Sequence, residues 1–458
     1  MGKSYAIILA AGKGTRMKSK LYKVLHPVAG KPMVDHVLAA VSAAGFDEII
    51  TIVGHGADQV KAALGDRSAY CLQAEQLGTG HAVLQAEELL GDKEGTTLVI
   101  SGDTPLFTSQ TLKDLVDLHQ KEGAKATLLT AHADNPFGYG RVIRSSDGSV
   151  LKVVEQKDAN EAEQAVQEVN TATYVFDNQA LFQALGQVGN DNAQGEYYLP
   201  DVIGILQDQG DKVAAYQMPD LAEAMGVNDR VALAEANQVY YRRNNDFHMR
   251  NGVTIVDPAS VFIEAGVEIG ADTVIEPNVQ LRGKTIIGED CHIDSRTIIT
   301  DSTIGNRVEI SSSDIESAKV ADDVTIGPNA HLRPGADLRA GVHIGNYVEV
   351  KNAIIGEGSK AGHLTYIGDA EIGKHVNVAC GVIFANYDGV NKHKSYVGDD
   401  VFIGSDVTII SPVKVGDRAF IAAGSTISKD IPEDAMGIAR QRQENKENYR
   451  KKLPISKK

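Results

Sequence analysis

The chain has 458 residues, 43% of them hydrophobic and 23% charged, which is long enough for two or three domains with cores of their own. Its formal net charge of −16 argues against nucleic-acid binding, which requires a basic surface. Three distant cysteines, Cys71, Cys291 and Cys380, predict reduced thiols in a cytoplasmic protein. No segment is long and apolar enough to span a bilayer, and the apolar run Tyr5–Ala11 is too short for a secretion signal.

Strand-like and helix-like segments alternate in the first half of the chain. Apolar runs bounded by turn residues predict strands at Tyr5–Ala11, Glu48–Val53, Thr97–Ser101, Lys125–Thr130, Gly140–Ile143, Val150–Glu155 and Thr173–Phe176. Helices are predicted over Met33–Ala44 and Thr111–Lys121. This alternation predicts an α/β, Rossmann-like domain whose mostly parallel sheet carries helices on both faces.

A glycine turn follows the first predicted strand, in the segment Leu9-Ala10-Ala11-Gly12-Lys13-Gly14-Thr15-Arg16-Met17. Such a turn exposes backbone N–H groups that suit a phosphate, and Lys13 and Arg16 add positive charge. The spacing matches neither the Walker A motif nor GxGxxG. By itself, the segment therefore fits a phosphate site and a simple tight turn equally well.

An aspartate stands at the end of another predicted strand, in Leu98-Val99-Ile100-Ser101-Gly102-Asp103. Ligands of doubly wound sheets bind at the carboxyl ends of the strands, and a carboxylate there suits Mg²⁺ beside phosphate oxygens. Asp103 alone fits a turn or cap equally well. Together with the glycine turn, it favours nucleotide and metal chemistry.

A glycine-free segment rich in Ala, Asn, Arg and Tyr, residues 228–250, predicts one connecting helix. The expected organisation is a first domain at 1–229, a helical linker at 230–250 and a second domain at 251–458. The second domain ends in the basic tail Gln441–Lys458, which we expect to be solvent-exposed.

Aliphatic residues recur at six-residue steps through the second half of the chain. They are Ile263, Ile269, Ile275, Leu281, Ile287 and Ile293; Ile326, Leu332, Leu338, Ile344 and Val350; and Val397, Ile403, Ile409, Val415, Ile421 and Ile427. A hexapeptide period is typical of a parallel β-helix in which about 18 residues form one coil. The segment 386–392 breaks the period, which predicts a loop projecting from the helix.

The period also places individual side chains. Arg333 and Lys351 follow core positions 18 residues apart and should lie one above the other, about 4.8 Å apart. Two stacked cations fit an anion site, although a solvated ridge is the alternative. His363 has a different phase from His331 and His343, so a shared zinc site is not expected.

Ordered motifs along the whole chain resemble one enzyme family. They are Leu9–Met17, Lys23, the stretch Gln73–Gly80, Gly102-Asp103, Gly138–Arg141, Glu155–Asp158 and Gly226–Asp229, followed by the hexapeptide half. The chain resembles the bifunctional bacterial N-acetylglucosamine-1-phosphate uridyltransferase/glucosamine-1-phosphate acetyltransferase family. The resemblance implies a nucleotidyltransferase domain followed by a left-handed β-helix, as a homotrimer.

For the first half, the resemblance implies uridylyl transfer from UTP to N-acetylglucosamine-1-phosphate with release of pyrophosphate. Asp103 and Asn228 would hold Mg²⁺, and Lys23 would face the phosphates. Nucleotide or sugar contacts are implied for Leu9, Ala10, Ala11, Gly12, Gln73, Gly78, Thr79, Gly140, Glu155, Asn170 and Asn228. The product, UDP-N-acetylglucosamine, is a precursor of peptidoglycan and lipopolysaccharide.

For the second half, the resemblance implies acetyl transfer from acetyl-CoA to glucosamine-1-phosphate, with His363 as the general base. Arg333 and Lys351 would bind the phosphate, and Tyr366 and Asn377 the sugar. Acetyl-CoA contacts are implied for Cys380, Asn386, Tyr387, Ser405, Ala423 and Arg440.

Two positions depart from the usual pattern of the family. Ala172 stands where glycine is common, and Ala379-Cys380-Gly381 replaces Gly-Ala-Gly near the expected thioester. Two alternatives to a bifunctional enzyme are a pyrophosphorylase with a purely structural β-helix and a silent scaffold. The intact glycine turn argues against the scaffold, and Arg333, Lys351 and His363 argue against a passive β-helix.

Overall fold

The structure is a computed structural model that describes residues 2–146, 148–192 and 194–454. Residues 455–458 of the predicted basic tail lie outside the described residues. The chain divides into two compact units, Met1–Tyr240 and Tyr241–Lys458. The division falls within helix α9 (Arg230–Arg250), which matches the helix predicted between the two halves.

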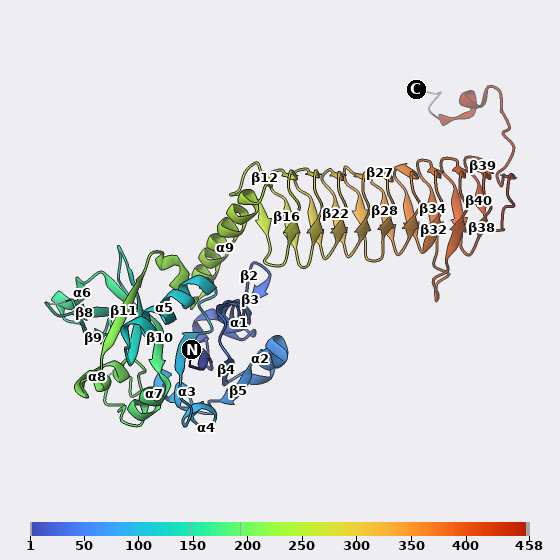
Figure 1. Ribbon diagram of the computed structural model, residues 1–458. Helices are drawn as coiled ribbons and strands as arrows, with labels where there is room; N and C mark the ends of the chain where they lie inside the picture. The colour runs from blue at the N-terminus through green and yellow to red at the C-terminus, as the bar shows by residue number, and fades with distance from the viewer. Residues whose placement is uncertain (1, 147, 193, 455–458) are drawn as a thin grey trace. The chain divides into compact units, whose positions relative to one another are not determined.

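One mixed sheet forms the centre of the first unit (Figure 1). Its strand order is β11 (Val213–Met218), β7 (Ala126–His132), β10 (Glu168–Asp177), β6 (Thr96–Ser101), β1 (Ser4–Ala10), β4 (Glu48–Val53) and β5 (Ala69–Leu72). Strand β8 (Gly140–Arg144) pairs with β10 and with β9 (Val150–Val154), and β2 (Pro27–Val28) pairs with β3 (Lys31–Pro32). Strand β10 runs antiparallel to β6 and β7, and the other neighbours on the main path are parallel.

Helices cover both faces of this sheet, as the sequence predicted. They are α1 (Met33–Ala44), α2 (Ala57–Leu64), α3 (Thr79–Leu84), α4 (Glu87–Leu90), α5 (Ser109–Glu122), α6 (Glu161–Gln164), α7 (Asn178–Leu185) and α8 (Asp201–Asp208). Alternate residues of β1 separate the two cores: Ala6 and Ile8 pack against α1, α2 and α5, whereas Tyr5 and Ile7 pack on the side of α3, α7 and α8. Short 3-10 turns lie at Thr15–Met17, Lys23–Leu25, Gly65–Arg67 and Leu221–Ala224.

The edge strands β5 and β11 were not among the predicted strands. Most of their side chains are only half-buried, because each strand has a neighbour on one side only. Both segments begin with a short apolar run, Ala69–Leu72 and Val213–Tyr216, and periodicity alone does not distinguish such a run in a strand from one in a buried helix.

The second unit is a parallel β-helix with three faces, drawn as a ladder of strands in Figure 1. The first face contains β12 (Thr254–Ile255), β15 (Val274–Ile275), β18 (His292–Ile293), β21 (Glu309–Ile310), β24 (Thr325–Ile326), β27 (His343–Asn346), β30 (Lys360–His363), β33 (Asn377–Val378), β36 (Phe402–Ile403), β39 (Phe420–Ile421) and β41 (Met436–Gly437).

The second face contains β13 (Phe262–Ile263), β16 (Gln280–Arg282), β19 (Ile298–Thr300), β22 (Asp314–Glu316), β25 (His331–Leu332), β28 (Glu349–Lys351), β31 (Tyr366–Gly368), β34 (Ile383–Ala385), β37 (Thr408–Ile410) and β40 (Thr426–Ile427). The third contains β14 (Glu268–Ile269), β17 (Ile286–Ile287), β20 (Thr303–Ile304), β23 (Lys319–Val320), β26 (Asp337–Leu338), β29 (Ile354–Ile355), β32 (Ala370–Ile372), β35 (Ser395–Val397) and β38 (Lys414–Val415). The predicted parallel β-helix is confirmed, and its left hand stays a prediction from the family.

The aliphatic core continues through the stretches where the six-residue period is lost in sequence. Ile299, Ile304 and Ile310 are all buried in one continuous core, although the first step is five residues and the second is six. Register shows the same shortening, since His292 pairs with Glu309 at a distance of 17 residues and Glu309 with Thr325 at 16. Where a corner is one residue shorter, the six-residue period is therefore lost in the sequence, but the coils still stack continuously.

The predicted projecting loop follows β34 and ends before β35. Asn377 pairs with Phe402, 25 residues later, because the loop adds residues to this coil. A bridge between Tyr387 and Lys392 closes the loop into a short antiparallel turn. Among the described helices, none is long and apolar enough to cross a membrane.

Candidate active sites

A cavity of about 470 Å³ opens at the carboxyl ends of β1 and β6. The glycine turn reaches it directly from β1, and Ser101 and Asp103 reach it from β6. The structure thus brings together nine residues that the sequence assigned to nucleotide and metal binding, namely Leu9, Ala10, Ala11, Gly12, Lys23, Gln73, Gly78, Thr79 and Asp103.

A cation bridges the two predicted metal ligands at this cavity. The Lys23 ammonium contacts Asp103 Oδ2 and donates to Asn228 Oδ1 at 3.2 Å. A backbone hydrogen bond holds the segments of Asp103 and Asn228 together, because the N–H of the neighbouring Val227 donates to the Asp103 carbonyl at 2.9 Å. One point in space is therefore within reach of a carboxylate oxygen and an amide oxygen, a donor set that suits Mg²⁺.

The loop that carries Gly78 is held by backbone hydrogen bonds to residues near position 197. Tyr197 N–H donates to the Leu77 carbonyl at 2.8 Å, and Gly80 N–H donates to the Tyr197 carbonyl at 2.8 Å. Gly78 has a φ of 112°, and a Cβ there would lie 2.5 Å from the Tyr197 carbonyl oxygen. Only glycine fits this close approach without moving the loop.

A smaller cavity of about 190 Å³ adjoins the first and shares Leu9, Thr79, Ser101 and Glu196 with it. It brings together the three predicted sugar contacts. Glu155 and Asn170 line it, Asn170 pairs in register with Gly140, and a Cβ on Gly140 would lie 3.1 Å from Glu155 Oε1. These residues come from β8, β10 and the turn after β9, which only the fold places side by side.

Burial changes the acidity of the groups that line the smaller cavity. Desolvation raises the pKa of Glu155, and the neighbouring carboxylates Asp158 and Asp201 raise it further. Burial also raises the pKa of Asp201. The Tyr174 hydroxyl is fully buried, which raises its pKa, and it accepts a 2.6 Å hydrogen bond from Asn170 Nδ2. Perturbed groups that converge in a cavity are typical of a binding site.

Ala172, the departure from the family pattern, adopts a left-handed conformation with a φ of 56°. It lies in a bulge of β10 between Asn170 and Tyr174, and its N–H donates to Asn170 Oδ1 at 3.2 Å. Its methyl group lines the smaller cavity. The usual glycine would adopt this φ without strain.

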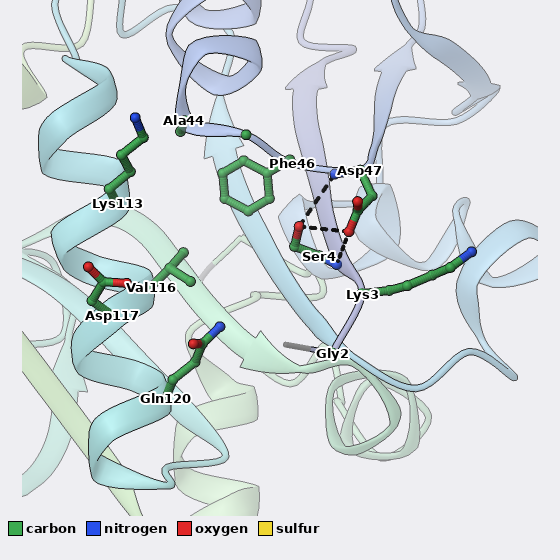
Figure 2. Close-up of a pocket in the computed structure, with 11 residues that line it drawn as sticks. Gly2, Lys3, Ser4, Ala44, Phe46, Asp47, Lys113, Val116, Asp117 and Gln120 are labelled. Carbon is green, nitrogen blue, oxygen red and sulfur yellow. Dashed lines mark hydrogen bonds between the residues drawn. The ribbon is translucent and has the colours of Figure 1, made fainter.

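Another cavity of about 370 Å³ lies at the opposite end of β1, beside the end of α1 and along one side of α5 (Figure 2). At its floor, the Ser4 N–H donates to Asp47 Oδ2 at 2.8 Å, and the Ser4 hydroxyl contacts the same atom. These contacts lower the pKa of Asp47. Its carboxylate therefore joins β1 to the loop before β4, and none of the predicted site residues lies here.

Arg333 and Lys351 occupy adjacent coils in the same register, as predicted. Leu332 pairs with Val350, and the Arg333 N–H donates to the Val350 carbonyl at 2.8 Å. Arg333 is not a free cation, because its Nη1 donates to Glu349 Oε1 at 2.8 Å, which raises its pKa.

Lys392 in the projecting loop is a third cation at this place, which the sequence analysis missed. Its ammonium lowers the pKa of Lys351, and the charge of Arg333 adds to the effect. Since Lys392 lies 41 positions after Lys351, outside the six-residue phase, only the way the loop folds back shows their proximity. Glu349 and Asp369 lie beside these cations, and the close approach of Lys392 to Lys351 favours an anion site over a solvated ridge.

The predicted base and three of the predicted acetyl-CoA contacts follow one corner of the β-helix. His363, Cys380, Ser405 and Ala423 each stand two residues after a core position of the first face. Successive corners are joined by hydrogen bonds, from Asp406 N–H to the Cys380 carbonyl and from Gly424 N–H to the Ser405 carbonyl, both at 2.8 Å. Arg440 follows the last strand and has an aliphatic carbon near Gly424.

The His363 ring is exposed on its corner, and its neighbour in register on the preceding coil is Asn346. The coil then crosses the second face through β31, which contains Tyr366 and ends at Gly368, the register partner of Lys351. His363 and the cation group thus stand at opposite edges of one face. Asn377, at the start of β33, pairs with Lys360.

Hydrogen bonds tie the start of the projecting loop to the coils. Asn386 is buried, and its Nδ2 donates to Asp369 Oδ2 and, at 3.5 Å, to the Tyr366 hydroxyl. Tyr387 is exposed and donates to the Gly389 carbonyl at 2.6 Å. The Asn391 N–H and His393 hold the pKa of Asp388 at about 2, so its carboxylate stays charged and braces the loop.

A zinc site of the kind weighed for this β-helix would need several clustered ligands. Within residues 2–146, 148–192 and 194–454, no group of three or more His, Cys, Asp and Glu side chains is arranged to hold a metal ion. The candidate Mg²⁺ ligands form a smaller set, since Asn228 contributes an amide oxygen.

Comparison with known proteins finds two family matches within the chain. Residues 5–223 match the Nucleotidyl transferase family, and residues 394–429 match the bacterial transferase hexapeptide repeat, in six repeats. The chain is 62% identical over 457 residues to the "Bifunctional protein GlmU" of Enterococcus faecalis, covering 100% of both chains. It is 60% identical over 453 residues to that of Listeria welshimeri, covering 99% of each. The chain belongs to the GlmU family.

The similarity to GlmU proteins extends over the full length, and a third relative from Latilactobacillus sakei is 61% identical over 452 residues, covering 99% of this chain and 98% of its own. The resemblance drawn from the motifs is confirmed. As a member of this family, the chain is a bifunctional enzyme that combines a nucleotidyltransferase domain with hexapeptide repeats of the acyltransferase type.

Proposed function

We propose that the two units perform consecutive reactions in the synthesis of UDP-N-acetylglucosamine. The β-helix would transfer the acetyl group of acetyl-CoA to glucosamine-1-phosphate. The first unit would then transfer the uridylyl group of UTP to N-acetylglucosamine-1-phosphate and release pyrophosphate. The reactions divide between residues 1–229 and 251–458, with 230–250 as the linker.

For uridylyl transfer, the two adjoining cavities would bind the two reactants next to each other. We assign the larger cavity to UTP, with the Leu9–Gly12 backbone on the phosphates, and the smaller to the amino sugar. Asp103 and Asn228 would hold Mg²⁺, which neutralises phosphate charge when bound. Lys23, already at these oxygens, would face the phosphates. The sugar phosphate oxygen attacks the α-phosphorus and pyrophosphate leaves, so positioning and charge neutralisation account for the catalysis.

For acetyl transfer, the cations Arg333 and Lys351 hold the sugar phosphate, and Tyr366 and Asn377 the sugar. His363 accepts a proton from the amine as the amine nitrogen attacks the thioester carbon. The carbon–sulfur bond breaks, and the thiolate takes the proton from the His363 imidazolium, so that the coenzyme leaves as its thiol. Asn386, Tyr387, Cys380, Ser405, Ala423 and Arg440 would line the path of the coenzyme along the β-helix corner.

We also propose a cytoplasmic homotrimer. The substrates are charged metabolites, and the three cysteines are free. Large apolar side chains are exposed on the first face of the β-helix, where the Phe402 and Phe420 rings stack with centroids 4.9 Å apart and Met436 follows them. Burial of such a stack against other copies of the chain would remove apolar surface from water.

The observation that carries the proposal is the presence of two separate constellations, Asp103 with Asn228 in one unit and His363 with the Lys351 group in the other. The test follows CoA release and pyrophosphate release separately on the purified full chain. His363→Ala should lower acetyl transfer by about 10²–10⁴-fold and leave uridylyl transfer unchanged. Asp103→Ala should do the reverse. Loss of both activities in either folded variant would refute the two-site assignment.

A further inference from the structure

Tyr22 is a buried tyrosine, only 6% exposed, whose side chain reaches the last residue of β1. Its hydroxyl donates to the Ala10 carbonyl at 2.8 Å. The ring lies over Gly56, which has a φ of 93°, and a Cβ on this glycine would come within 3.1 Å of Tyr22 Cγ. Burial raises the pKa of Tyr22 to about 12, so the hydroxyl keeps its proton at neutral pH and always acts as the donor in this bond.

The hydrogen bond from Tyr22 fixes the direction of the peptide group between Ala10 and Ala11. In a planar trans peptide, the carbonyl of one residue and the N–H of the next point in opposite directions. The preceding carbonyl, that of Leu9, accepts from the Gly102 N–H at 2.8 Å and therefore points towards the end of β6. Successive carbonyls of a strand point to opposite sides, so the Ala10 carbonyl points away from β6 and the Ala11 N–H points towards it.

The Ala11 N–H is available to a ligand. Ala11 is buried and lines the proposed nucleotide cavity, as does Asp103 at the end of β6. Within residues 2–146, 148–192 and 194–454, the N–H groups of Ala11 and Gly12 donate to no protein acceptor. Buried backbone donors are rarely left without a partner, so an N–H that faces a cavity suits an oxygen atom of a bound molecule.

The residue after Tyr22 is Lys23, whose ammonium contacts Asp103 and Asn228, the two predicted metal ligands. The glycine turn packs closely on this segment, because Lys23 leaves no room for a side chain on Gly14. Two consecutive side chains therefore hold the end of β1 and the cation at the predicted metal site.

We propose that Tyr22 is a positioning residue for uridylyl transfer, which directs the Ala11 N–H at an oxygen atom of the bound nucleotide. A backbone donor that is already oriented needs no reorganisation when the ligand binds. Without the hydroxyl, the buried Ala10 carbonyl loses its donor and the peptide group is free to turn towards another one. The inference rests on the proposed use of UTP and extends it to a residue outside the predicted contacts.

The test measures KM for UTP and for N-acetylglucosamine-1-phosphate by pyrophosphate release from the full-length enzyme. Tyr22→Phe keeps the ring over Gly56 and removes only the hydroxyl. We expect KM for UTP to rise about 3–10-fold, because one hydrogen bond to the nucleotide is weakened in the ground state and the transition state alike. KM for the sugar phosphate and kcat should stay within about 2-fold of the wild-type values.

Tyr5→Phe is the matched control. Tyr5 is a buried tyrosine at the other end of β1, and its hydroxyl donates to the Glu94 carbonyl at 3.2 Å. The substitution removes a hydrogen bond of the same kind from the same strand, far from the nucleotide cavity. It should leave KM for UTP unchanged.

The outcomes separate the possible failures. An unchanged KM for UTP in Tyr22→Phe, an equal rise in both KM values, or an equal effect of Tyr5→Phe would overturn the positioning role. A wild-type enzyme that does not turn over UTP would instead refute the proposed function. Acetyl transfer and circular dichroism verify that each variant is folded. If Tyr22→Phe does not fold, Tyr22→Leu provides the same comparison.

Discussion

The two candidate sites are both built from titratable residues, but in opposite ways. In the first unit, polar groups from distant strands converge inside adjoining cavities, and burial shifts the acidity of Glu155, Asp201 and Tyr174. In the β-helix, Arg333, Lys351 and His363 stand on the outside of successive coils, where water reaches them.

This difference determines which physical effect each site uses. An enclosed site selects its ligand through desolvation and fixed hydrogen bonds, because an unpaired polar group is costly there. A repeat presents charges at a fixed pitch along an exposed edge, where Coulomb attraction is weaker and screened by salt. The β-helix site should therefore depend on ionic strength more than the cavity does.

The largest effect on substrate binding is expected from loss of a cation on the β-helix. Lys351→Met should raise the KM for glucosamine-1-phosphate about 10–100-fold, since a charged hydrogen bond contributes about 1.5–3 kcal/mol. At about 1 M salt the Debye length is near 3 Å, and the wild-type KM should approach that of the variant. CoA release measured at low and high salt tests both expectations.

Arg307→Met is the matched control for this experiment. Arg307 is also an exposed cation on the β-helix, but it pairs with Asp323 at 2.7 Å, away from the predicted site residues. Its replacement should leave the KM unchanged. An effect of Arg307→Met as large as that of Lys351→Met would mean that overall charge, and not the stacked pair, attracts the substrate.

A smaller effect is expected from pH at the enclosed site. The raised pKa of Glu155 means that this carboxyl keeps its proton to higher pH in the folded protein than in the unfolded chain. Its contribution to stability is complete below the ordinary glutamate pKa of about 4.3 and is lost as pH rises through the raised value. The affinity for the sugar should change with pH in the opposite direction. It should increase as pH rises, because an ionised carboxylate accepts hydrogen bonds better than a protonated carboxyl group does.

The KM for N-acetylglucosamine-1-phosphate should accordingly fall as pH rises through the Glu155 pKa, by up to about tenfold per pH unit below it. The measurement is pyrophosphate release from about pH 5 to about pH 8. The sugar phosphate titrates in the same range, and Glu155→Gln should keep only that part of the profile. If the KM of the variant and that of the wild type depend on pH in the same way, Glu155 does not take part in sugar binding.

The smallest effect concerns the departure at Ala172. Its left-handed backbone costs an alanine about 1–2 kcal/mol, and glycine loses about 0.5–1 kcal/mol in chain entropy. Ala172→Gly should therefore raise the free energy of unfolding by about 0.5–1 kcal/mol in denaturant titration. Ala126→Gly, at a buried position of regular strand β7, should lower it instead. If both variants are destabilised, the φ of Ala172 carries no strain.

Much of the cavity site was predictable because its signals are local. The glycine turn and Asp103 each directly follow a buried strand, and a strand's carboxyl end is where a ligand can reach its backbone. Lys392 carries no such signal. It lies off the repeat phase, so its place beside Lys351 depends on a contact that spacing does not encode.

The sequence alone determined the parallel stack of coils, because the hexapeptide period is a local pattern of buried aliphatic residues, and with it the register of Arg333 on Lys351. The tertiary structure decided which remote groups meet. Lys23 reaches Asn228 across 205 positions, and Asn170 pairs with Gly140 beside Glu155. Such contacts between distant residues depend on strand order, sheet register and loop direction. These features result from the packing of the whole unit and are not encoded in any short stretch of residues.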